Sequence, residues 1–211
     1  MNKISIDGGV YLVFDPGGDK EFLLHQLRRA VKSPVAAVQV WNNWVETASI
    51  DSLIADIIEV CRPRKIPVII NNDVSLLRTT GADGIHFDSV DLAAAALHQL
   101  LPFHIRGITC GNDLHAVRFA AQNKFDYISF CSMFPSPSAT TCDLVDPDII
   151  KQATEIFERA VFISGGVNPV NMLAIPVQAN YNGVAVISGI MQAENPAARV
   201  DEYINSLKRR Q

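Results

Sequence analysis

Two turns near the end of the chain have the composition of a phosphate-binding site. Val161 to Val167 reads VFISGGV, and Gly183 to Ile190 reads GVAVISGI. Each is an apolar run typical of a buried strand and is followed at once by Gly or Ser. The backbone N–H groups of such turns can bind phosphate oxygens. A tight turn without a ligand explains the same glycines equally well, so the elements that position them decide between the two readings.

Eight short apolar, β-branched runs along the chain predict strands. Their continuous rather than alternating apolar character indicates strands covered on both faces, as in a parallel sheet. The expected strands are Val10 to Phe14, Ala36 to Val40, Val68 to Ile70, Gly84 to Phe87, Ile105 to Thr109, Tyr127 to Phe130, Val161 to Ser164 and Gly183 to Ile187.

Segments with helical periodicity separate these runs, and Asp51, Asp113 and Asp148 lie at or near the start of three of them. Eight βα units in so short a chain favour an α/β fold of the single-domain (β/α)8 TIM barrel type over an open doubly wound sheet. The expected helices are Glu21 to Val31, Ile50 to Cys61, Leu92 to Leu100, Asp113 to Gln122 and Pro147 to Phe157.

The overall composition points to small-molecule chemistry. The chain has 211 residues, 48% hydrophobic and 19% charged, which is enough for one domain spanning residues 1–211. A net charge of −4 excludes the basic footprint expected for nucleic acid or an anionic membrane as partner. No stretch approaches the roughly 20 apolar residues of a membrane span, and the N-terminus lacks the pattern of a signal peptide. We expect a cytoplasmic protein.

The four cysteines have neither CxxC spacing nor the context of a small secreted domain. Disulfides and a zinc site are therefore not expected. Cys61 and Cys110 are interpreted as buried apolar residues. Cys131 and Cys142 flank a long segment after the sixth run, and their role stays open.

Polar side chains stand where nearly every expected strand ends. In a (β/α)8 barrel the functional residues lie at these carboxyl ends and in the loops that follow. This pattern makes a ligand site there the favoured reading, although strand ends exposed to water are often polar. The residues are Asp15, Gln39, Asn71, Asn72, Asp73, His86, Asp88, Asp91, Thr109, Ser132, Ser136, Ser138, Ser164, Gly165, Gly166 and Ser188.

Between Tyr11 and Ile190 the order of motifs resembles that of the thiamine phosphate synthases and their thiazole tautomerase relatives. The most specific part is PVIINND at Pro67 to Asp73 followed by GADGIHFDSVDL at Gly81 to Leu92. The other matching segments are YLVFDP from Tyr11, AAVQVWNN from Ala36, GITCGN from Gly107, FDYISFCSMFPSPS from Phe125, ISGGVNP from Ile163 and GVAVISGI from Gly183.

The resemblance implies a reaction that joins a hydroxymethylpyrimidine diphosphate to a thiazole phosphate, with Mg²⁺ and release of pyrophosphate. The thiazole phosphate would lie on main-chain N–H groups of Gly165 and Gly166, with a second contact at Ile187 and Ser188. Ser136 and Ser138 keep the two hydroxyls of a Thr-x-Thr pair in the family's flexible loop. These two small-molecule phosphates are the expected partners, and the sequence leaves open whether the chain acts as a homodimer.

On the diphosphate side the resemblance assigns Gln39, Asn71 and Thr109 to substrate binding. Mg²⁺ would be held by Asp91, with Asn72 where the family has a carboxylate. Family cations are replaced at four positions: Arg by Trp41, Lys by Asn43, Arg by Asp73 and the loop Lys by Ala139.

A charge-assisted contact to phosphate contributes about 1.5 to 3 kcal/mol, so three lost contacts lower activity by roughly three to six orders of magnitude. Asp73 could replace the missing metal ligand, and Arg62, Arg64 or Arg78 could replace a lost cation. A surface Arg on a helix is more often simply solvated.

Two alternatives follow from these substitutions. A tautomerase-like enzyme would bind only the thiazole phosphate, but Ser132 stands where that branch has a catalytic histidine. Cys131 and His86 remain as proton carriers, although His86 is more readily interpreted as orienting or structural. A non-catalytic phosphate-ligand binder is the other alternative, in which Trp41 and Trp44 either stack on a ring or pack at the rim. The sequence identifies no catalytic residue.

Overall fold

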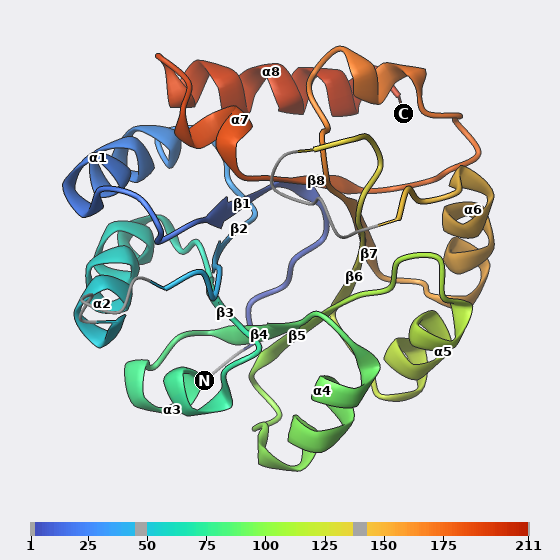
Figure 1. The fold of residues 1–211 in the computed structure, drawn as a ribbon, viewed down its shortest axis with the longest axis horizontal. Coiled ribbons are helices and arrows are strands. Elements are labelled where there is room, and N and C mark those ends of the chain that lie inside the picture. Colours follow the sequence, from blue (N-terminus) through green and yellow to red (C-terminus); the bar gives the residue numbers. More distant parts are fainter. Residues whose placement is uncertain (1–2, 45–49, 137–142, 211) are drawn as a thin grey trace.

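A computed structural model describes residues 3–44, 50–136 and 143–210 of the chain. Eight parallel strands pair in sequence order and close into a barrel, because β1 pairs with both β2 and β8 (Figure 1). The predicted (β/α)8 barrel is therefore confirmed, and the open sheet is excluded. The strands are β1 (Gly9–Phe14), β2 (Ala37–Val40), β3 (Val68–Asn71), β4 (Gly84–Phe87), β5 (Ile105–Thr109), β6 (Tyr127–Phe130), β7 (Ala160–Ile163) and β8 (Gly183–Val186).

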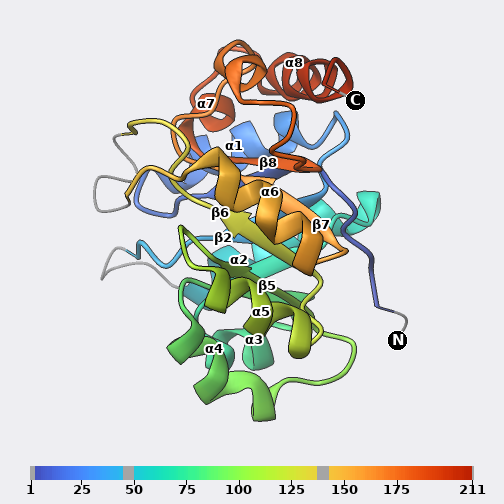
Figure 2. The same cartoon turned by 90° about the vertical axis from the view of Figure 1, so that its right-hand side faces the viewer.

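Helices surround the barrel and follow the strands along the chain (Figures 1 and 2). Short polar side chains start several of them by accepting backbone N–H groups, as Asp19, Asp73, Ser89 and Asp113 do. The helices are α1 (Lys20–Ala30), α2 (Ile50–Cys61), α3 (Val74–Thr80), α4 (Val90–Ala96), α5 (Leu114–Gln122), α6 (Pro147–Ile156), α7 (Ser188–Met191) and α8 (Pro196–Lys208), with 3-10 turns η1 (Arg62–Arg64), η2 (Leu97–Gln99) and η4 (Asn171–Ala174).

A few expected boundaries differ from the structure. The helix expected from Leu92 to Leu100 begins at Val90, because Ser89 accepts the Leu92 N–H, and its last part is the 3-10 turn η2. Asp148 lies inside the first turn of α6, while Asp146 is the residue that caps it. Strand β7 begins and ends one residue earlier than expected.

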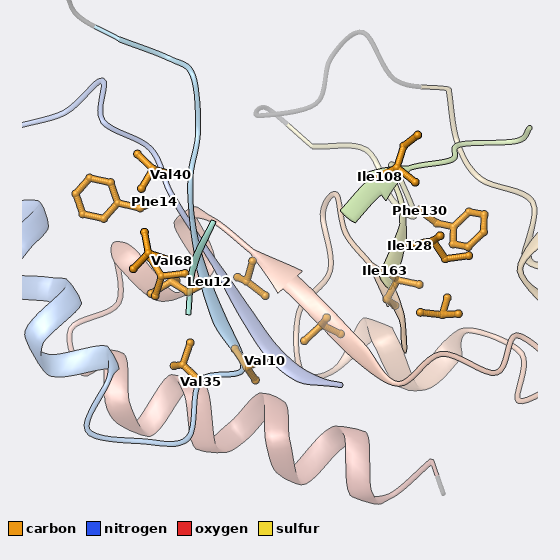
Figure 3. Close-up of a cluster of buried hydrophobic side chains, with 14 of the residues drawn as sticks. Val10, Leu12, Phe14, Val35, Val40, Val68, Ile108, Ile128, Phe130 and Ile163 are labelled. Atoms are coloured by element: carbon orange, nitrogen blue, oxygen red, sulfur yellow. The ribbon is translucent and has the colours of Figure 1, made fainter. Parts of the chain in front are cut away.

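Alternating strand residues divide the core into two layers. Outward-facing residues such as Leu12, Val40 and Ile128 pack against the helices (Figure 3). Inward-facing residues such as Tyr11, Tyr127 and Phe162 fill the barrel itself. Cys61 and Cys110 belong to the outer layer and are buried, as predicted.

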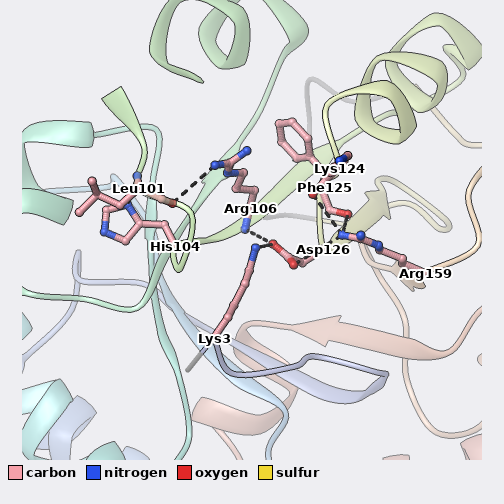
Figure 4. Close-up of polar contacts among 8 residues, drawn as sticks. All are labelled: Lys3, Leu101, His104, Arg106, Lys124, Phe125, Asp126 and Arg159. Atoms are coloured by element: carbon pink, nitrogen blue, oxygen red, sulfur yellow. Dashed lines mark hydrogen bonds and ion pairs between the residues drawn. The ribbon is translucent and has the colours of Figure 1, made fainter. Parts of the chain in front are cut away.

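Ion pairs close the amino-terminal end of the barrel around Asp126. Its carboxylate pairs with Lys3 Nζ at 2.7 Å and with Arg159 Nη1 at 3.7 Å, and it accepts the Arg106 backbone N–H at 2.7 Å (Figure 4). These contacts hold the segment before β1 against β5 and β6. In the described part of the chain, no helix is long and apolar enough to cross a membrane.

Candidate active site

The β7 turn has the backbone shape of an anion-binding loop. Gly165 and Gly166 both have positive φ, at 79° and 64°, so their N–H groups follow one another in a left-handed turn. Neither position has room for a side chain. A Cβ on Gly165 would overlap Ser132 Oγ, and one on Gly166 would lie 2.7 Å from the Pro135 carbonyl oxygen. Glycine is therefore required at both positions, because each has a positive φ and each lies too close to neighbouring atoms for a side chain.

The segment after β6 runs directly along this turn. Met133 N–H donates to the Ser164 carbonyl at 2.9 Å, and Phe134 N–H donates to the Gly165 carbonyl at 3.0 Å. The Pro135 carbonyl oxygen lies beside Gly166, and the next residue, Ser136, is half-buried. Ser138, Ala139 and Cys142 lie outside the described residues.

Strand β8 brings the second predicted phosphate contact to the same edge. Because β7 and β8 are parallel neighbours, with Ile163 opposite Val184, the turns that follow them are adjacent. Ile187 directly precedes the short helix α7, and Ser188 is its exposed first residue. The structure therefore brings Gly165, Gly166 and Ser188 together at the carboxyl end of the barrel.

Tyr203 of α8 supports both turns from behind, and sequence reasoning missed it. Its hydroxyl donates to the Val167 carbonyl at 3.0 Å, and a Cβ on Gly189 would lie 2.7 Å from the same hydroxyl oxygen. Asn171 Nδ2 also donates to the Gly166 carbonyl at 2.8 Å. The glycine turn is thus fixed by side chains that touch its carbonyl side, and no local motif around Tyr203 signals this role.

On the other side of the barrel, Gln39 and Thr109 belong to one buried polar cluster. Gln39 Oε1 accepts from the Tyr11 hydroxyl at 3.0 Å, and the Tyr11 and Tyr127 hydroxyl oxygens lie 2.6 Å apart. His86 links this pair to Thr109, with Nδ1 at 3.0 Å from the Tyr127 hydroxyl and Nε2 at 2.9 Å from Thr109 Oγ1. His86 therefore has an orienting position, as the sequence favoured.

Burial controls the charge of this cluster. Desolvation lowers the pKa of His86 to about 4, against a smaller opposing effect of the Asp88 carboxylate, so the ring is neutral at pH 7. Desolvation also raises the pKa of the Tyr11 and Tyr127 hydroxyls far above the usual range. The cluster holds protons in fixed places and carries no charge of its own.

Asn71 and Asn72, at the end of β3, close on Asp88 at the end of β4. Asn71 Nδ2 donates to Asp88 Oδ1 at 3.1 Å, and Asn72 Nδ2 donates to Asp88 Oδ2 at 2.6 Å. The Asp88 N–H donates back to Asn72 Oδ1 at 3.0 Å. Asn71 is 1% exposed, and its Oδ1 has no hydrogen-bond partner among the described residues. That oxygen is therefore a buried acceptor with an unused hydrogen-bonding capacity.

The two predicted magnesium ligands, Asn72 and Asp91, have different surroundings. The single oxygen of the Asn72 amide already accepts from the Asp88 N–H. Asp91 is exposed in the first turn of α4, and no group of three or more His, Cys, Asp or Glu that could hold a metal occurs among the described residues. These residues do not fit a two-carboxylate magnesium site.

The sequence also offered Asp73 as a replacement metal ligand and three arginines as replacement cations. Asp73 caps α3 by accepting the Leu76 N–H at 3.0 Å. Arg62 and Arg64 lie in η1, which precedes β3 and is therefore at the opposite end of the barrel. Arg78 is exposed in the last turn of α3, which leads from the mouth toward that same end. In the described structure the Asp73 carboxylate is thus used as a helix cap, although its N–H donates to the Asn71 carbonyl at 2.7 Å.

Side-chain charge differs sharply between the two ends of the barrel. Within the described residues, the segments that follow the eight strands contain no Lys or Arg, but they contain Asp15, Asp73, Asp88 and Asp113. Asn43, at the position of a family Lys, donates instead to Asp15 Oδ1 at 2.9 Å. Cations gather at the amino-terminal end, as in Figure 4. In the described residues the charged side chains of the mouth segments are thus acidic, so an anion there would have to rely on backbone N–H groups.

The two tryptophans of the β2 segment are both half-buried. Trp44 packs against the outer core layer, which agrees with rim packing. The Trp41 N–H donates to the Phe14 carbonyl at 2.9 Å and continues the pairing of β1 with β2. Trp41 is therefore held at the mouth of the barrel, where the family has an Arg.

Comparison with known proteins gives one consistent result. Residues 10–190 match the family model described as thiamine monophosphate synthase. The chain is 32% identical over 200 residues to a thiamine-phosphate synthase of Xylella fastidiosa (strain Temecula1 / ATCC 700964), covering 92% of this chain and 82% of the relative. It is 24% identical over 205 residues to the thiamine-phosphate synthase of Methanobrevibacter smithii, covering 97% of both chains.

Solved structures agree in fold. A thiamine phosphate pyrophosphorylase from Pyrococcus furiosus superposes with a TM-score of 0.76 at 18% identity, covering 96% of each chain. A (S)-3-O-geranylgeranylglyceryl phosphate synthase from Thermoplasma acidophilum superposes with a TM-score of 0.65 at 14% identity, covering 96% of this chain and 94% of the other. At these identities the likeness establishes the barrel fold alone.

Proposed function

We propose that this chain, which belongs to the thiamine monophosphate synthase family, joins a hydroxymethylpyrimidine diphosphate to a thiazole phosphate. The observation that carries the proposal is the pair of consecutive left-handed glycines, Gly165 and Gly166, beside the β8 turn. Main-chain N–H groups in this arrangement suit a monophosphate. The family membership gives the identity of the phosphate.

The acceptor substrate would be held by its phosphate. The N–H groups of Gly165 and Gly166 would donate to its oxygens, together with the turn at Ile187 and Ser188 and the hydroxyls of Ser136 and Ser138. The turn is preorganised by Tyr203 and Asn171, so little ordering accompanies binding. The thiazole ring would then point from β7 and β8 toward the centre of the mouth.

The pyrimidine would lie on the opposite side, against Gln39, Asn71 and Thr109. Asn71 Oδ1 lacks a hydrogen-bond partner among the described residues, so an amino group on the ring would satisfy it if the Asn71 side chain turned toward the mouth. In the reaction the thiazole nitrogen forms a bond to the pyrimidine methylene carbon. The carbon–oxygen bond to the diphosphate breaks, and pyrophosphate leaves with the electron pair. The protein contributes mainly by positioning the two rings.

Stabilisation of the leaving pyrophosphate is the weak part of this site. In other family members cations and Mg²⁺ are expected there, but the residues here do not fit the metal, and the described mouth segments contain no Lys or Arg. We therefore derive no step through the metal. The expected consequence is slow turnover, lower by roughly three to six orders of magnitude for three lost charge-assisted contacts.

The test is a single-turnover assay with excess enzyme, which detects slow chemistry. Purified protein is mixed with both substrates, with Mg²⁺ or with a chelator, and thiamine phosphate and pyrophosphate are quantified together. Equal amounts of the two products above the protein-free rate are expected. Gly166→Ala is the matched variant, because it removes the phosphate turn and should abolish product. No product from the unaltered chain would reject the joining reaction.

The acidic mouth favours one second candidate, a protein that binds thiazole phosphate without joining it to a pyrimidine. Calorimetry with thiazole phosphate, pyrimidine diphosphate and thiamine phosphate separates the two. Binding of the diphosphate supports the synthase. Binding of thiazole phosphate alone, with no product in the single-turnover assay, supports the second candidate.

A further inference from the structure

Six polar side chains form one continuous hydrogen-bonded chain inside the barrel. It crosses from β2 through β1, β6 and β4 to β5, so it joins positions that lie far apart in the sequence. Five of the six side chains are buried, and Thr109 is half-buried at the mouth. In order, the members are Gln39, Tyr11, Tyr127, His86, Thr109 and Ser129, with neighbouring atoms 2.6 to 3.0 Å apart.

Proton counting fixes the direction of the first three links. Gln39 Oε1 can only accept, so the single proton of the Tyr11 hydroxyl is donated to it. Tyr11 must then accept in its bond with Tyr127, whose proton is used there. Tyr127 must in turn accept from His86 Nδ1, which therefore carries a proton.

The remaining links follow from the neutral ring of His86. Among the described residues, no carboxylate hydrogen-bonds to either ring nitrogen, and burial keeps the imidazole uncharged. With the proton on Nδ1, Nε2 is a bare acceptor, and the Thr109 hydroxyl donates to it. Ser129 then donates to Thr109. In this state the Thr109 hydroxyl can accept a hydrogen bond from a ligand but cannot donate one.

We propose that this chain couples the amide orientation of Gln39 to the donor state of Thr109, with Tyr11 and Tyr127 as positioning residues. When a ring donor approaches Gln39 from the mouth, Oε1 turns toward it, so that Nε2 replaces Oε1 beside the Tyr11 hydroxyl and donates to it. The Tyr11 hydroxyl then donates to Tyr127, and the Tyr127 hydroxyl donates to His86 Nδ1. The His86 proton leaves Nδ1 and one is taken up at Nε2, so the total number of protons is unchanged.

The reversed chain frees the Thr109 proton for a ligand. His86 Nε2 now donates to Thr109, whose hydroxyl can donate to a phosphate oxygen. A ring with an amino group at Gln39 thus favours an anion at Thr109, whereas a ring that only accepts opposes it. This coupling rests on the proposed function for the identity of the ring and the anion. A pyrimidine bound at Gln39 would in this way strengthen the binding of the diphosphate at Thr109.

Gly107 leaves the space that the Tyr127 ring of this hydrogen-bonded chain occupies. It is the residue opposite both His86 and Tyr127 in the sheet, and a Cβ there would overlap the Tyr127 ring. The Tyr127 and His86 rings stack with centroids 5.6 Å apart and an interplanar angle of 18°. Both rings are therefore held in one orientation.

The experiment is nitrogen NMR of the full chain labelled in its histidines, combined with calorimetry. The ligand-free protein should carry the His86 proton on Nδ1. Addition of 4-amino-5-hydroxymethyl-2-methylpyrimidine with inorganic pyrophosphate should move it to Nε2. The pyrimidine should raise pyrophosphate affinity roughly tenfold, the value of one charge-assisted hydrogen bond.

Tyr127→Phe should abolish that tenfold coupling while each separate affinity stays within about twofold. Tyr11→Phe breaks the chain at the next link and serves if the first variant does not fold. Tyr181→Phe is the control, since its hydroxyl donates to the Met172 carbonyl outside the chain. Coupling that persists in both chain variants would overturn the proposal, as would a ligand-free proton on Nε2. If neither probe binds while the single-turnover assay yields product, the coupling is overturned and the proposed function stands.

Discussion

The two halves of the barrel mouth present different groups to a ligand. The β7–β8 half presents backbone N–H groups, shaped by Gly165 and Gly166 and supported from behind by Tyr203. The β2–β4 half depends on side chains, and Trp41 and Asn43 stand there in place of cations. A single substitution removes a side-chain contact without changing the fold. A backbone site persists as long as the turn does, which explains how one half can keep its chemistry while the other changes.

Restoring the side-chain half should have the largest effect. Trp41→Arg combined with Asn43→Lys adds two charge-assisted contacts of about 1.5 to 3 kcal/mol each. Pyrophosphate affinity, measured by calorimetry, should rise by about two to four orders of magnitude.

The control for this pair places the same charges at the other end of the barrel. Gln178→Arg with Asn180→Lys changes two exposed residues that precede β8. Its effect should stay within about threefold, because long-range attraction is screened by salt. Equal gains from both pairs would mean that net charge, and not local contact, limits binding.

Damaging the backbone half should cost about 3 kcal/mol of stability. Gly165→Ala introduces both a positive-φ alanine and a clash with Ser132, and both effects are destabilising. Thiazole phosphate binding should be lost. Chemical denaturation and calorimetry measure the two effects separately.

Gly111→Ala provides the matched control. Its φ is also positive, at 55°, but a Cβ there meets nothing within 4 Å. Only the conformational cost of about 1 kcal/mol remains, and binding should be unchanged. If the two variants lose the same stability, close packing of the turn contributes nothing.

The same division explains what the sequence could predict. The apolar runs located all eight strands because burial on both faces leaves a strong local signal. The Gly-Gly turn was found because positive φ and close approach restrict the residue type. The roles of Tyr203, Tyr11 and Tyr127 were missed because their partners are distant in sequence. The Asn72–Asp88 contact was also missed, since the resemblance assigned Asn72 to Asp91 instead.

Asn72→Asp should convert that contact into a metal-sensitive one. Two carboxylates would then face each other where Asn72 Nδ2 now donates to Asp88, so stability should fall by about 2 kcal/mol without metal. Asp tolerates the left-handed backbone of this position, where φ is 57°. Mg²⁺ should restore the melting temperature of this variant and leave that of the unaltered chain unchanged.

Asn72→Gly is the companion variant, because it deletes the contact without strain or new charge. It should lose stability that Mg²⁺ does not restore. Restoration in both variants would place any metal effect elsewhere in the molecule. If Mg²⁺ does not change the melting temperature of Asn72→Asp, adding one carboxylate is not enough to make a metal site in this half.

The smallest change tests how far the backbone half depends on any side chain. Ser188→Ala removes one exposed hydroxyl next to the turn, worth about 1 kcal/mol. Thiazole phosphate affinity, measured by calorimetry, should fall roughly fivefold. Ser75→Ala, on the exposed face of α3, should have no effect. A loss of a hundredfold or more from Ser188→Ala would mean that a side chain dominates this half too. Both halves would then bind their ligands mainly through side chains, and they would differ only in which of the family's side chains are present.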